Sequence, residues 1–229
     1  MTPTKGEIER LRYHWSVPTH DDDALILDHH PFKDRHLIVA ALTRSQGVVR
    51  GVLRSARGGK SPLAGSIQIL SEVRMSFFRK AQADLATFQR VDLKTSSYPL
   101  AKDFRRSTAS AVVAELLLTF CPEDEPAPRR YRLGVSALTA LLEAIDPDRV
   151  IAYVQYWVLQ LGGLMPPPET LDGDPAADEF AFIIACRRVA LAELDLEVPS
   201  SAVRRLDAMV RRHAERPLRA LDFFRQHGG

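Results

Sequence analysis

The hydrophobic residues of this chain change their spacing near residue 96, and that change limits the folds open to it. Between residues 24 and 93 they come in short runs rich in valine, isoleucine and leucine, and residues 73–77 alternate apolar and polar side chains as a half-buried strand does. Strands are expected at residues 24–28, 36–43, 47–55, 66–70 and 72–79. So many short strands, closely spaced, fit an OB-fold barrel.

From residue 98 onward the spacing is that of amphipathic helices. Asp146 before Pro147 suits a helix N-terminus, and Gly162 suits a helix end. Helices are expected at residues 100–120, 131–145, 147–161, 178–194 and 200–215. The sequence therefore predicts an α+β protein with an N-terminal OB-fold β-barrel and a C-terminal helical domain. Its expected parts are a leader (1–22), the barrel (23–95) and the helical domain (96–229).

The composition is that of a folded protein with no bias toward a partner: 45% hydrophobic residues and a formal net charge of +2. Cys121 and Cys186 are too few for a disulfide framework, so both are expected to be reduced thiols. No apolar run approaches 18 residues, and the first residues lack the apolar core of a signal peptide. A cytoplasmic protein is the expectation.

Basic residues gather in the barrel sequence, where residues 35–71 contain no acid. Such a stretch predicts a surface for a polyanion, and glycines beside it allow a close approach to phosphate. Arg50 and Arg54 are expected on one strand face, because side chains alternate along a strand. The alternative is a solvated barrel face. The candidate nucleic-acid-binding residues are Arg35, Arg44, Arg50, Arg54, Arg57, Lys60 and Arg74.

The same stretch holds Gly59-Lys60-Ser61, which is the end of a phosphate-binding Walker A loop. That loop needs its first glycine at position 54, where this chain has Arg54. Lys60 is therefore expected to contact a polynucleotide phosphate rather than a nucleoside triphosphate.

No catalytic or metal-binding arrangement stands out. There is no nucleophile–base motif, and the histidines, which concentrate in residues 1–36, show no ligand spacing. We expect a protein that is not an enzyme and needs no metal or cofactor. A phosphate-handling enzyme stays open as an alternative that a nucleotide hydrolysis assay tests.

The order of these features resembles a known family. The segments DALILDHHPFKDRHLIVAALTRSQGVVRGVLRSARGGKSPLAGSIQIL, AVVAELLLTF, YWVLQLGGLMP and RPLRALDFFRQ are similar, in this order, to segments of the bacterial recombination-repair protein RecO family. The resemblance covers nearly the whole chain from Asp23. Two features depart from the family: the four-cysteine zinc site that many members carry is missing, and the leader has no counterpart.

The resemblance implies a recombination mediator. Such a protein binds single- and double-stranded DNA, anneals complementary strands, and works near the nucleoid with a RecR-like partner. Together they help to load RecA onto strands coated by single-strand-binding protein. The main alternative is a helical protein-interaction scaffold whose barrel has lost nucleic-acid binding.

The resemblance also implies that the helical domain receives the acidic, phenylalanine-ending tail of single-strand-binding protein. Such a tail needs an apolar pocket with an arginine rim. Basic pairs seven residues apart lie on one helical face near the C-terminus and are candidates for that rim: Arg204, Arg205, Arg211 and Arg212. A solvated face and a site for a second DNA strand are the alternatives.

Overall fold

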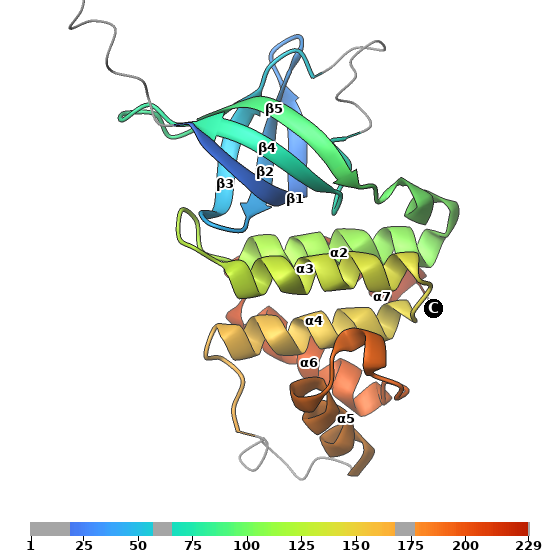
Figure 1. Cartoon of the computed structure of the whole chain (residues 1–229). Helices are drawn as coiled ribbons and strands as arrows, with labels where there is room; N and C mark the ends of the chain where they lie inside the picture. Colours follow the sequence, from blue (N-terminus) through green and yellow to red (C-terminus); the bar gives the residue numbers. More distant parts are fainter. Residues whose placement is uncertain (1–18, 57–65, 168–176, 229) are drawn as a thin grey trace, which may run out of the picture.

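The N-terminal part of the protein is a closed β-barrel (Figure 1). The computed structural model describes residues 19–56, 66–167 and 177–228. The strands are β1 (His20–Phe32), β2 (His36–Thr43), β3 (Gly47–Leu53), β4 (Glu72–Phe78) and β5 (Ala86–Thr95). They close in the order β1-β2-β3-β5-β4, and the predicted OB-type barrel is confirmed.

The barrel closes where β3 runs parallel to β5, whereas its other strand pairs are antiparallel. Gly51 pairs with Ala86 at this seam. A Cβ on Gly51 would lie 2.8 Å from the Ala86 carbonyl oxygen and 2.7 Å from the Phe88 ring. Because real Cβ atoms do not approach so closely, the seam requires glycine at this position.

One strand prediction was wrong, and another extended two residues too far. Residues 66–70 form turns rather than a strand, although Ile67 and Leu70 are buried. The Leu70 amide donates to the Ile26 carbonyl, and Leu70 has a φ of 67°, so this segment crosses the barrel end as a plug. The strand that the sequence did not predict is β5, because many of its residues are polar. Strand β3 ends at Leu53, so Arg54 lies in the following turn and does not share a strand face with Arg50.

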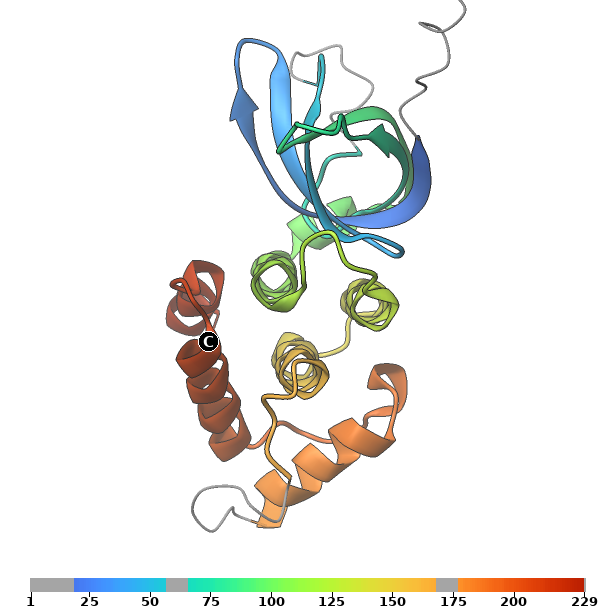
Figure 2. The same cartoon turned by 90° about the vertical axis from the view of Figure 1, so that its left-hand side faces the viewer.

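Helices form the rest of the described chain. After the short 3₁₀ helix η1 (Tyr98–Lys102) come α2 (Phe104–Phe120), α3 (Pro128–Leu142), α4 (Pro147–Leu161), α5 (Ala177–Arg188), η3 (Leu191–Glu193), α6 (Ser200–His213) and α7 (Arg219–His227). Figure 2 shows α2 and α3 beneath the barrel, α4 in the next layer, and α6 and α7 along one side. The expected cap at Asp146 is confirmed, since its carboxylate accepts from the Arg149 amide. The single helix expected at residues 178–194 is wrong, because α5 ends at Arg188.

Two hydrophobic cores are present, and one of them crosses from the barrel to the helices. The smaller core fills the barrel interior. The larger core belongs mainly to α2–α7 but also takes in side chains of the barrel: Leu25, Leu27, Leu42, Val48 and Leu70. Helix α3 approaches the barrel closely at Gly134, where a Cβ would lie 2.4 Å from the Leu25 side chain.

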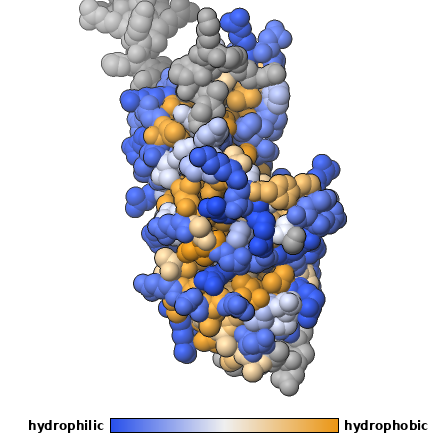
Figure 3. All heavy atoms as spheres, turned by 90° about the vertical axis from the view of Figure 1, so that its right-hand side faces the viewer, coloured by the Kyte–Doolittle hydropathy of each residue, from blue (hydrophilic) through white to orange (hydrophobic). Residues whose placement is uncertain are grey.

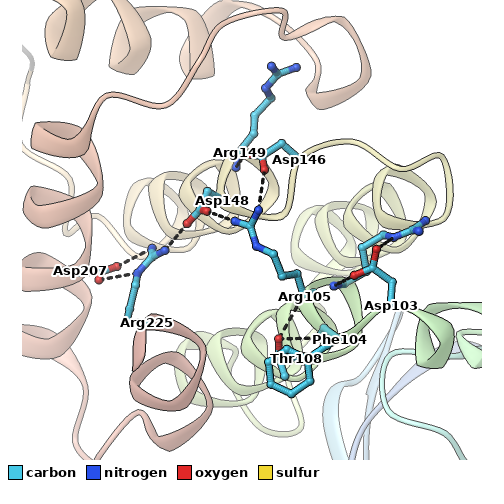
Figure 4. A network of polar contacts seen from close by, with 10 residues as sticks. Asp103, Phe104, Arg105, Thr108, Asp146, Asp148, Arg149, Asp207 and Arg225 are labelled. Atoms are coloured by element: carbon cyan, nitrogen blue, oxygen red, sulfur yellow. Dashed lines mark hydrogen bonds and ion pairs between the residues drawn. The ribbon is translucent and has the colours of Figure 1, made fainter. Parts of the chain in front are cut away.

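A polar network also joins four helices (Figure 4). Arg225 of α7 lies between Asp207 of α6 and Asp148 of α4, with its Nε 2.9 Å from Asp207. Asp148 in turn accepts from Arg105 of α2 at 2.5 Å. Burial lowers the pKa of Arg225, but the hydrogen bonds and charges of the two aspartates outweigh it and raise that pKa above its usual value. The network fixes α6 and α7 against the rest of the helices.

Candidate nucleic-acid interface

The barrel end far from the helices carries two of the predicted phosphate-binding residues. Arg35 lies in the β1–β2 turn and Arg54 in the turn after β3. Leu37 pairs with Leu53 between these turns, and the Ser55 amide donates to His36 Nδ1 at 3.2 Å, so both arginines lie at one end of the barrel. Both side chains are exposed, and within the described ranges neither forms an ion pair.

An aromatic ring accompanies this basic end. Phe32 ends β1 and is half-buried, and the Lys33 ammonium lies 5.3 Å from the centre of its ring. Basic side chains around an aromatic face are what a single-stranded nucleic acid requires, since phosphates need cations and bases stack on rings. Arg57 and Lys60 follow on the chain but lie outside the described residues.

The other predicted residues behave differently. Arg50 Nε lies 2.8 Å from Glu123, and Arg74 lies 3.2 Å from Asp23. Arg44 is exposed in the β2–β3 turn, at the barrel end that faces the helices. The structure therefore does not bring the predicted residues together on one face. Some lie at one end of the barrel, one lies at the other end, and two form ion pairs on the strands between.

Residues 35–71 contain no acid, but acids from a distant part of the chain lie beside the barrel. The connection between α2 and α3 lies against the barrel, where Glu123 bridges to Val48. It brings Glu123 to Arg50 and Asp124 to Arg79, the latter at 2.6 Å. The hydrogen bond from Arg79 to Asp124 raises the pKa of that arginine. Sequence reasoning missed these pairs because the partners are more than 40 positions apart.

A charged cluster lies where the barrel meets the helices. The Glu72 carboxylate accepts from Lys94 and from the Tyr131 hydroxyl of α3, both at 2.7 Å, and from Thr95 at 3.0 Å. Burial would raise the pKa of Glu72, but these hydrogen bonds and the charge of Lys94 lower it below its usual value. Burial and the bond to Glu72 raise the pKa of Tyr131. The cluster connects the barrel to the helices.

The four arginines of α6 do not form one rim. Arg205 pairs with Glu179 of α5, and Arg211 Nη2 lies 2.8 Å from Asp222 of α7. Arg204 and Arg212 are exposed and form no ion pair with any residue that the structure describes. A hollow of about 470 Å³ lies between α5 and α6, and its lining combines Arg204, Arg205 and Arg212 with Glu179, Ala208 and Met209.

A groove between α3 and α4 has two arginines beside two aromatic side chains. It has a volume of about 320 Å³ and is lined by Arg129, Arg132, Leu133, Ser136, Tyr153, Trp157 and Leu161. The indole nitrogen donates to the Cys186 carbonyl and the tyrosine hydroxyl to the Val189 carbonyl, so the polar ends of both aromatic residues are satisfied and their apolar parts line the groove. Sequence reasoning missed this groove, although Tyr153 and Trp157 are one helical turn apart.

The described part of the chain holds no group of three or more histidine, cysteine, aspartate or glutamate residues that fits a metal ion. Cys121 and Cys186 are buried free thiols, and burial raises the pKa of each to about 12. Across the same residues, no helix is both long enough and apolar enough to cross a bilayer.

The fold defines a class: an OB-barrel protein with a helical second part, whose free barrel end carries basic side chains and an aromatic ring. Two family models match the chain, Recombination protein O N terminal over residues 17–97 and Recombination protein O C terminal over residues 101–169. The chain belongs to the RecO family. This membership supports a role for the protein in DNA repair and recombination.

Curated relatives carry the same name. The DNA repair protein RecO of Koribacter versatilis strain Ellin345 is 26% identical over 192 residues, which is 79% of this chain and 77% of the relative. The DNA repair protein RecO of Cutibacterium acnes is 32% identical over 126 residues, 55% of this chain and 51% of the relative. The DNA repair protein RecO of Bacillus subtilis strain 168 is 29% identical over 146 residues, 63% of this chain and 56% of the relative.

Proposed function

We propose that this protein is a non-catalytic recombination mediator that binds single- and double-stranded DNA and anneals complementary strands in the cytoplasm, at the nucleoid. With a RecR-like partner it helps to load RecA onto strands coated by single-strand-binding protein. The observation that carries the DNA-binding part is the exposed pair Arg35 and Arg54 beside Phe32 at the free end of the barrel. Arginines neutralise phosphates there, and the ring stacks on a base.

The remaining predicted arginines contribute less in this proposal. Arg50 and Arg74 already have carboxylate partners, so a phosphate must displace Glu123 or Asp23 to reach them. Displacement replaces one anion by another and yields little net gain, whereas a phosphate on an unpaired arginine releases counterions. Arg44, Arg57 and Lys60 stay predicted contacts.

A salt titration of single-stranded DNA binding tests this proposal. With four to six phosphates neutralised, log affinity against log salt has a slope of about −3 to −4. Arg35→Ala with Arg54→Ala flattens the slope by about one unit or more, because each removes a phosphate contact worth about 0.7. Arg50→Ala with Arg74→Ala is the matched control and changes the slope less. No binding at low salt favours the alternative, a protein-interaction scaffold.

We also propose that the tail of single-strand-binding protein binds in the groove between α3 and α4. A terminal phenylalanine needs an apolar floor, which Tyr153 and Trp157 supply, while Arg129 and Arg132 meet the carboxylates. Two of the arginines of α6 already face acids, so fewer of their charges are open to the tail.

Fluorescence anisotropy with a labelled acidic peptide that ends in phenylalanine separates the two places. Arg132→Ala weakens binding of the peptide about tenfold, because a charge-assisted hydrogen bond contributes about 1.5–3 kcal/mol. Arg212→Ala leaves the affinity for the peptide unchanged. The reverse ranking assigns the tail to α6, as the sequence predicted.

A further inference from the structure

The surface between α2 and α7 is an unexplained feature of the helical part. The two helices run antiparallel: Glu115, late in α2, accepts from the Ala220 and Leu221 amides at the start of α7, both at 3.1 Å. At the other end Phe104, the first residue of α2, meets Phe223 of α7, with ring centres 6.1 Å apart. These contacts reach from the start of α7 to Phe223 in its middle.

Two phenylalanine rings are exposed on this surface. Phe104 is 54% exposed and Phe223 is 46% exposed, although each has the other as a neighbour. His227 stacks on Phe223 with ring centres 4.5 Å apart and an interplanar angle of 27°. Figure 3 faces the side where α2 begins and α7 ends, and apolar side chains reach the surface there among hydrophilic ones. A row of three rings in water is costly for a protein unless something covers it.

A cleft continues the same surface toward the barrel. It has a volume of about 490 Å³, and its lining includes Ala111, Glu115 and Leu118 of α2, Leu27 and Asp28 of β1, and Arg216, Pro217 and Arg219. Phe104, Ala111, Glu115 and Leu118 repeat at the spacing of one helical face. Fourteen residues of helix span about 21 Å, so the rings and the cleft lie along about that length of one face of α2, which we call the groove between α2 and α7.

Two arginines and two acids line the cleft of this groove, so its formal charges balance. Arg219 is exposed and pairs with no residue that the structure describes, and Arg216 is exposed with one bond, from Nε to the Thr119 hydroxyl at 3.2 Å. Both carboxylate oxygens of Glu115 are occupied by the amides of α7. Asp28, the other acid, lies 3.9 Å from His30.

The order of the groups matches a single strand of DNA. Arg219, Phe223 and His227 recur every four residues along one line of α7, so a cation lies one turn, about 6 Å, from an exposed ring. A base stacked on Phe223 places its backbone within reach of Arg219. Stacking accepts any base, because every base has a π-face, and bases inside a duplex are not available for it.

We propose that the groove between α2 and α7 is a second site for single-stranded DNA, which holds the partner strand during annealing. The inference rests on the proposed function, since annealing brings two strands together. The first strand lies at the free end of the barrel. The second lies along the helices, with bases on Phe104 and Phe223 and phosphates on Arg216 and Arg219.

Energy transfer between two oligonucleotides tests the inference. The full chain is loaded with a donor-labelled thymine homopolymer and titrated with an acceptor-labelled cytosine homopolymer, which does not pair with it. Phe104→Ala with Phe223→Ala weakens capture of the second strand by about 30-fold or more and leaves the first within about twofold, because stacking is worth about 1–3 kcal/mol for each of the two bases. Phe223→Tyr keeps the ring and retains capture.

Phe180→Ala is the matched control, because Phe180 is a 37% exposed ring on α5, away from the groove. Photocrosslinking of 5-iodouracil DNA to the unaltered protein gives a second readout that no misfolded variant affects, with adducts expected on Phe104, Phe223 or His227. The inference is overturned if capture of the second strand survives the double substitution, or if Phe180→Ala weakens it equally. It is also overturned if the crosslinked adducts lie only on the barrel. None of these outcomes affects the proposed function. Failure to bind even the first strand overturns the proposed function as well.

Discussion

Replacing Tyr131 by phenylalanine tests the connection between barrel and helices. The change removes one oxygen atom, which donates at 2.7 Å to the Glu72 carboxylate. A hydrogen bond to a charged group contributes about 1.5–3 kcal/mol. Glu72 keeps Lys94 and Thr95 as donors, so we expect the lower part of that range, about 1.5–2 kcal/mol. With a urea slope near 2 kcal/mol per molar, the unfolding midpoint falls by about 0.75–1 M.

The loss depends on pH with a defined sign. The pKa of Glu72 is lower in the folded protein than its usual value, so its contribution is present above the unfolded pKa and is lost as the pH falls through the folded pKa. Tyr131→Phe removes one donor to the charged form, so the folded pKa of Glu72 rises toward its usual value. The difference between the two proteins is therefore full at pH 7 and shrinks toward pH 3.

Urea unfolding at pH 7 and pH 3, followed by circular dichroism, measures both quantities. Tyr153→Phe is the matched control: its hydroxyl donates to the Val189 carbonyl at 3.3 Å, a neutral partner that does not titrate. Its cost is the same at both pH values. An equal loss for Tyr131→Phe at pH 7 and pH 3 would refute the assignment of Glu72 as the charged partner.

Other predictions follow from packing and burial. Arg225→Ala leaves Asp207 and its neighbours without their main cation and lowers the free energy of unfolding by about 2–4 kcal/mol in urea; a loss under 1 kcal/mol contradicts the network in Figure 4. Gly51→Ala forces a Cβ into the barrel seam and costs about 1–3 kcal/mol by the same assay, whereas an unchanged midpoint contradicts the close approach. Cys121 and Cys186, with pKa values raised to about 12, stay unreactive toward a thiol reagent at pH 8 until urea unfolds the protein; prompt native reaction disproves their burial.

The sequence predicted the fold where a pattern was local. Alternation at residues 73–77 and the apolar runs before it indicated the barrel, and Asp146 marked a helix start that the structure confirms. The strand β5 was missed because it alternates weakly and carries charges on its outer face. Residues 66–70 looked like a strand because a buried plug and a buried strand have the same composition.

The candidate site was less predictable for a physical reason. Its residues could be named, but whether each has an opposite charge beside it depends on chain segments far apart. Arg50 and Arg54 look alike in the sequence, yet one faces Glu123 and the other faces solvent. The rings of Phe104 and Phe223 lie more than 100 positions apart, and only the packing of α7 on α2 brings them together.

The larger core has a consequence for dissecting this protein into pieces. Four leucines and a valine of the barrel are sealed by helices. A fragment that stopped at residue 95 would expose them to water at about 1.5–3 kcal/mol each, a sum as large as the whole stability of many domains. Such a fragment would aggregate or lose its shape, and a missing activity in it would say nothing about where DNA binds. Assigning roles to the two halves therefore requires single substitutions in the intact chain.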